Sequence, residues 1–142
     1  MKRTITIIAI VMIAILGAIL VKLTVPLSYR EYPVYKEAVD FVTELQKKSV
    51  LTAEQVAIRY DFYHTDYENT EMPKRIQIKS KPLNDGTVRV TIFDPCCEDD
   101  SIFSSIERIY MRKDTMGRWQ PTKVEFSHKG RGRFGWTTRP TS

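Results

Sequence analysis

The chain is poor in the residues that build metal centres and disulfide frameworks. Its 142 residues include only two cysteines and two histidines. The cysteines, Cys96 and Cys97, are adjacent, and no C-x-x-C or H-x-x-H pair accompanies them. A zinc site and a framework of disulfides are therefore not expected. Neither histidine lies in a recognisable nucleophile motif, so we predict no catalytic residue, no metal and no cofactor.

The two thiols lie in the stretch FDPCCEDDS, residues 93–101. Pro95 lacks an amide proton and should end the preceding strand, which places Cys96 and Cys97 in an accessible loop. A disulfide between them would be strained, because neighbouring α-carbons lie about 3.8 Å apart, below the usual span of a disulfide. Three interpretations stay open: an intermolecular disulfide that would link copies of the chain, a vicinal redox switch, or two free thiols.

Charge is absent from residues 4–21, which read TITIIAIVMIAILGAILV. If the Lys22 side chain snorkels to the headgroups, the apolar span extends over about 22 residues, or roughly 33 Å of helix, which suffices to cross a bilayer. We therefore predict a transmembrane signal anchor over residues 1–25, in contact with lipid through residues 4–25. A cleaved signal peptide is the alternative, but the run is long and no A-x-A-like pair ends it.

Basic residues on either side of this run bear on its orientation. Lys2 and Arg3 favour a cytoplasmic amino terminus, whereas Lys22, Arg30 and Lys36 act against it from the other side. The short basic start resembles that of an export signal. We therefore expect the amino terminus inside and the remaining chain outside the cytoplasm.

After a linker over residues 26–32, two helices are expected. Pro33 suits the first position of a helix that runs to about Lys48 with one apolar stripe. A second helix should follow Thr52, which can cap it, with Gln55 as the capping-box partner.

Four strands should complete the domain. Residues 75–81 and 88–92 alternate between apolar and polar positions on either side of an Asn-Asp-Gly turn, which predicts a hairpin. Residues 102–113 and 118–128 form the other two expected strands. Consecutive strands pair antiparallel, so residues 33–128 are predicted to be an α+β domain with two helices packed on a four-stranded meander.

This order of elements resembles that of membrane-anchored cystatin-like and NTF2-like domains. The likeness rests on the anchor, the helices and an antiparallel meander that ends near a hairpin bearing Trp119. It implies a binding or scaffold role more often than catalysis, although a fold does not fix a function.

Residues 129–142 form a basic segment rich in glycine, arginine and aromatic residues. From residue 101 onward the chain has nine basic and three acidic residues, so its positive charge lies in this third. The candidates for contact with a partner are Lys129, Arg131, Arg133, Phe134 and Trp136. The alternative is that the segment folds back as a short edge strand over the sheet.

Taken together, these patterns predict a membrane-tethered, extracytoplasmic binding or scaffold module without an assignable reaction. Its partner would be another envelope protein or an anionic component, and we do not expect nucleic acid outside the cytoplasm. The alternative function is that of a small thiol-dependent redox protein or enzyme that uses Cys96 and Cys97.

Overall fold

The computed structural model describes residues 2–24, 26, 28–63, 74–97, 102–130 and 135–138, and it describes side chains of the first helix over residues 6–21. Within these residues the chain forms three helices and five strands. In chain order they are α1 (Lys2–Thr24), β1 (Arg30–Tyr32), α2 (Lys36–Lys48), α3 (Ala53–Asp61), β2 (Gln77–Pro82), β3 (Val88–Asp94), β4 (Ile102–Lys113) and β5 (Trp119–Gly130).

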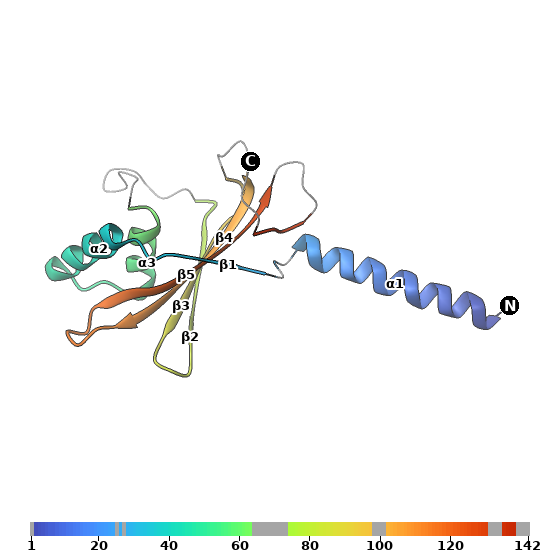
Figure 1. Ribbon diagram of the computed structural model, residues 1–142, viewed down its shortest axis with the longest axis horizontal. Helices are drawn as coiled ribbons and strands as arrows, with labels where there is room; N and C mark the ends of the chain where they lie inside the picture. The colour runs from blue at the N-terminus through green and yellow to red at the C-terminus, as the bar shows by residue number, and fades with distance from the viewer. Residues whose placement is uncertain are drawn as a thin grey trace.

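The five strands form one antiparallel sheet in the order β1-β5-β4-β3-β2. Helices α2 and α3 lie together on one side of this sheet, while β1 runs along β5 at its edge (Figure 1). The predicted α+β class is confirmed.

The predicted number of four strands is wrong, because the sheet has five. The additional strand β1 lies in the segment that was expected to be a linker, and it pairs Arg30 with Phe126 and Tyr32 with Val124 of β5. Three residues are too short to display an alternating pattern, and this strand depends on its neighbour. On the outer face, Lys123 of β5 forms an ion pair with Glu31.

Each of these two hairpin turns contains a glycine. Gly86 and Gly117 have φ of 77° and 76°, in the left-handed region that residues with a β-carbon rarely adopt. In the second turn, the Asp114 carboxylate accepts hydrogen bonds from the backbone N–H groups of Met116 and Arg118, at 2.8 and 3.0 Å. These local interactions hold β4 and β5 in register.

Helix α3 begins as predicted, with a complete capping box between Thr52 and Gln55. Helix α2 begins later than the predicted Pro33. The backbone of Tyr35 is extended, and its N–H donates to the Tyr60 hydroxyl at 3.1 Å, so a tertiary contact holds this residue outside the helix.

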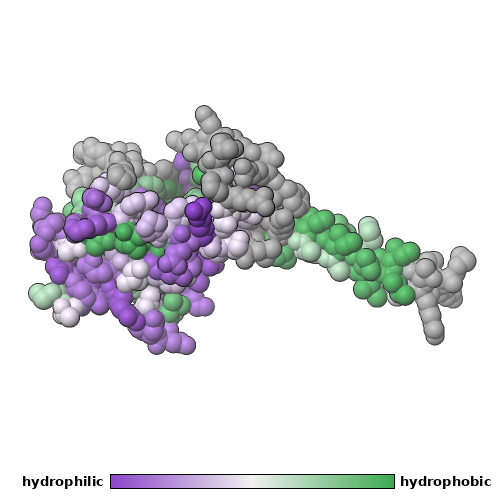
Figure 2. Space-filling view, in the orientation of Figure 1, coloured by the Kyte–Doolittle hydropathy of each residue, from purple (hydrophilic) through white to green (hydrophobic). Residues whose placement is uncertain are grey.

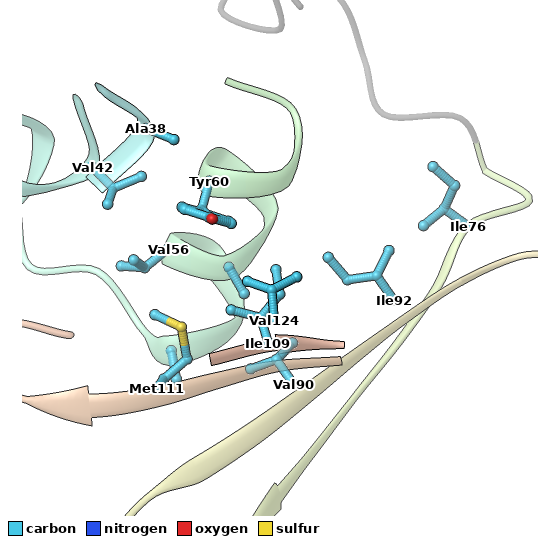
Figure 3. Close-up of a cluster of buried hydrophobic side chains, with 12 residues drawn as sticks. Ala38, Val42, Val56, Tyr60, Ile76, Val90, Ile92, Ile109, Met111 and Val124 are labelled. Carbon is cyan, nitrogen blue, oxygen red and sulfur yellow. The ribbon is translucent and has the colours of Figure 1, made fainter. Parts of the chain in front are cut away.

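The apolar core lies between α2, α3 and the helix-covered face of the sheet. In Figure 3, side chains from both helices point toward side chains from the central strands. The buried residues of the core are Ala38, Val42, Ala53, Val56, Ala57, Tyr60, Ile76, Val90, Ile92, Ile109, Met111 and Val124. Burial of these side chains is the main term that stabilises the domain.

Helix α1 extends away from this domain (Figure 1), and its described side chains, residues 6–21, present an almost wholly apolar surface (Figure 2). Its described side chains are exposed on every side, and the large apolar ones are Ile7, Ile8, Ile10, Val11, Met12, Ile13, Ile15, Leu16, Ile19, Leu20 and Val21. Among the described residues, no helix combines the length and the apolar character that crossing a membrane requires. The transmembrane role of residues 1–25 stays a prediction.

Candidate functional site

A cavity of about 270 Å³ lies where the ends of α2 and α3 meet the sheet. We call it the tyrosine pocket. It is lined by Tyr32, Tyr35, Ala38, Tyr60, Asp61, Tyr63, Glu107, Val124 and Phe126. For comparison, an engineered apolar cavity of about 150 Å³ is large enough to hold benzene. The tyrosine pocket therefore has room for a small organic molecule.

Glu107 enters the pocket from the middle of the sheet. It lies in β4 opposite Ile92 of β3 and Phe126 of β5, two residues before the fully buried Ile109. Because alternate residues of a strand share a face, Glu107 projects to the helix-covered side, where its neighbours are apolar. A carboxyl group at such a position requires a polar partner.

That partner is Asp61, the last residue of α3. The two carboxyl groups are hydrogen-bonded to each other. Each residue as a whole is half-buried, whereas its carboxyl group lies inside the protein. Burial, followed by the charge of Asp61, raises the pKa of Glu107 well above its usual value. Burial also raises the pKa of Asp61, and the hydrogen bond from Glu107 opposes that rise without cancelling it. The pair therefore favours a state that holds one proton between two oxygens.

Aromatic rings surround this acid pair. Tyr32 packs edge-on against Phe126, with ring centroids 5.9 Å apart. Tyr60 is buried, and burial raises the pKa of its hydroxyl, which remains neutral. Tyr35, by contrast, is 56% exposed and lies at the rim of the pocket. The pocket thus combines aromatic faces with a polar, proton-sharing centre.

The two cysteines lie outside the tyrosine pocket, in the loop after β3, where they were predicted. Cys96 is exposed and Cys97 is half-buried. The Cys97 thiol donates to the Ser105 hydroxyl at 3.3 Å, and the Cys97 N–H donates to the Phe103 carbonyl at 2.9 Å. Cys96 is thus the more accessible thiol of the pair.

The structure describes two of the five basic-segment candidates. The Lys129 ammonium lies 5.8 Å from the centre of the Phe103 ring. Trp136 is half-buried and its ring centroid lies 6.3 Å from that of Phe93.

The remaining candidates, Arg131, Arg133 and Phe134, lie outside the described residues. Just beyond them, Thr137 pairs antiparallel with His128, with N–H to carbonyl distances of 2.8 and 3.0 Å. This single bridge agrees with the alternative interpretation, a segment folded back along the sheet edge, which stays a prediction. A part of the basic segment therefore lies against the sheet.

No group of three or more potential metal-ligating side chains occurs within the part of the chain that the structure describes. Sequence reasoning missed the tyrosine pocket altogether and assigned no role to Asp61 or Glu107. One signal was present: Glu107 occupies a position in phase with Ile109, where alternation calls for an apolar residue. Asp61 gives no such signal, because its contact with Glu107 is non-local.

The chain matches no family model, and searches of curated proteins and of solved structures return no match. The resemblance to cystatin-like and NTF2-like domains therefore stays a prediction.

Proposed function

We propose that this chain is a membrane-tethered module whose extracytoplasmic domain binds a small ligand in the tyrosine pocket. We assign no reaction to it. The observation that carries the proposal is the pocket itself: a cavity of about 270 Å³ with aromatic walls and two convergent carboxyl groups. A mostly apolar cavity with a few convergent polar groups and perturbed pKa values is typical of small-molecule sites.

The apolar surface of α1 supports the tether. The helix backbone covers 23 residues, or about 35 Å at 1.5 Å per residue, and its described side chains, residues 6–21, carry no charge. A helix that is apolar all round needs a lipid or protein environment. We expect the full chain to remain with membranes after alkaline carbonate extraction and a variant lacking residues 2–24 to be released. Release of the full chain by carbonate would contradict the tether.

Lys2 and Arg3 support an orientation with the domain outside the cytoplasm. The exposed Cys96 thiol offers a reporter for it. In cells that produce the Cys97→Ser variant, a membrane-impermeant maleimide should label Cys96 without lysis. The Cys96→Ser, Cys97→Ser double variant is the control. Labelling that requires lysis would place the domain inside.

Ligand binding can be tested before the ligand is identified. A fragment library with cationic, neutral and anionic members is added to the full chain in maltoside micelles, and the aromatic NMR signals of Tyr32, Tyr63 and Phe126 are followed. We expect a subset of fragments to shift these signals with saturable dependence on concentration. If no fragment of any charge shifts them, the pocket is not a binding site.

A second contact, with an envelope protein or an anionic component, is proposed for the basic segment, residues 129–142. Its net positive charge supports this contact. Crosslinking in native membranes should capture a partner less efficiently with the Arg131→Glu, Arg133→Glu variant. Equal capture would mean that the basic segment serves the fold alone.

The thiol-dependent alternative is supported by the exposure of Cys96. An intermolecular disulfide through Cys96 would appear as a dimer on a non-reducing gel and disappear in the Cys96→Ser variant. A thiol-dependent activity lost on replacing both cysteines with serine would support the redox function instead.

A further inference from the structure

The acid pair of the tyrosine pocket has no compensating positive charge among the described residues. None of the ion pairs in this part of the chain involves Asp61 or Glu107. The interactions that act on the two carboxyl groups are burial and their contact with each other. A buried carboxyl that loses its proton without a partner is costly, so the pocket is electrostatically incomplete.

The aromatic walls of the pocket also favour a positive charge. Four tyrosines and one phenylalanine contribute to its lining. The faces of aromatic rings are negative and attract cations, and sites for quaternary ammonium groups are built from such rings. Both the rings and the acid pair therefore favour a positively charged occupant.

We propose that the tyrosine pocket binds a small organic cation, a substituted ammonium group, with its alkyl surface against the tyrosine rings and its charge beside Asp61 and Glu107. This inference rests on the proposed function, because it names the chemical class of the ligand for the same pocket. The ligand is an organic cation small enough for the cavity of about 270 Å³.

Other classes of ligand fit less well. An anion would be repelled by the acid pair. A metal ion would find two carboxyl groups but no third His, Cys, Asp or Glu side chain among the described residues. A neutral apolar molecule would remove the carboxyl pair from water without offering a partner for the negative charge of the pair, which costs free energy.

The test compares two compounds of nearly the same shape, choline and its uncharged carbon analogue 3,3-dimethylbutan-1-ol. Each is titrated calorimetrically into the full chain in maltoside micelles, since phosphocholine detergents would compete. We expect choline to bind at least about tenfold more tightly than the neutral analogue, which corresponds to the loss of one charge interaction in a desolvated site. Equal affinity would overturn the proposal, and so would the binding of neither compound.

Variants of the pocket residues test which side chains bind the cation. The Asp61→Asn, Glu107→Gln double variant removes the negative charge of the acid pair; it should weaken choline binding at least about tenfold and should not weaken binding of the neutral analogue. Tyr35→Leu removes a ring at the exposed rim, and it should weaken choline binding by about twofold to thirtyfold even if the double variant proves unstable. Glu125→Gln is the matched control, because Glu125 lies on the opposite face and is bonded to Tyr110. Weakening by the control and not by the pocket variants would overturn the assignment.

The outcomes separate this inference from the proposed function. If the neutral analogue binds as well as choline and shifts the signals of the pocket, the pocket binds ligands but not cations selectively. If choline fails and the fragment library also leaves the pocket unperturbed, both proposals are wrong.

Discussion

Glu107 gives the domain a pH dependence whose sign follows from the structure. Its pKa is raised in the folded state by burial and by the nearby Asp61 carboxyl, whereas in the unfolded chain it returns to about 4.3. Protonated Glu107 therefore stabilises the fold fully below pH about 4, and this stabilisation is lost as pH rises through the folded-state pKa. The unfolding free energy of the native chain should fall with rising pH in that window.

The size of this effect has an upper limit set by the number of protons involved. One proton held by the folded state and not by the unfolded state changes the free energy of unfolding by about 1.4 kcal/mol per pH unit. In Glu107→Gln the side chain is neutral at every pH and an amide N–H can still donate to Asp61. We expect the variant to match the native chain near pH 4 and to become progressively more stable than it above pH 5.

The assay is urea denaturation of the full chain in maltoside micelles at half-unit pH steps from 4 to 8, followed by tryptophan fluorescence. Trp119 reports on the junction of α2 and β5, where its backbone is bonded to Gln46. The control Glu125→Gln should keep the native slope above pH 5. Burial raises the pKa of Glu125, but hydrogen bonds from Lys123 and Tyr110 outweigh burial, so the net pKa is lowered. The contribution of Glu125 to the pH dependence of stability therefore falls below the pH range in which Glu107 acts. Parallel curves for the native chain and Glu107→Gln would refute the account of the acid pair.

Three further predictions concern the stability of the full chain in the same assay at pH 7. Ile109→Ala opens a cavity at a fully buried position and should cost about 2–5 kcal/mol; a cost below about 1 kcal/mol would mean that the core lies elsewhere. Thr52→Ala removes the cap of α3 and should lower the free energy of unfolding by about 0.5–2 kcal/mol, whereas Thr52→Asp should retain most of the native stability. An unchanged urea midpoint for Thr52→Ala would count against the cap. Gln46→Ala breaks both hydrogen bonds to the Trp119 backbone, at 2.9 and 2.8 Å, and should cost about 1–3 kcal/mol, whereas a neutral effect would show that α2 is held by apolar packing alone.

The elements that the sequence predicts are those specified by neighbouring residues. The capping box of Thr52 and Gln55 lies within one helical turn, and the turn glycine Gly86 connects two strands whose alternation is visible on either side. In each case the interactions that determine the element lie within a few consecutive residues. Such elements can be predicted from a single sequence.

The features that could not be predicted depend on contacts between distant residues. Strand β1 has three residues and exists through its pairing with β5, which comes about ninety residues later in the chain. The tyrosine pocket likewise joins Tyr32, Asp61 and Phe126 from three separate elements. Sequence offers only the charge of Glu107 on an apolar strand face as a hint, and that hint does not name its partner.

The most direct test of the central claim is a carbon-13 NMR titration of the Glu107 side-chain carboxyl in the full chain, without and with choline. We expect a Glu107 pKa well above the usual value in the protein without choline. With choline bound we expect a lower apparent pKa of Glu107, because a bound cation favours the charged carboxylate. A Glu107 pKa in the ordinary range without choline, or a raised pKa that choline leaves in place, would contradict the central claim.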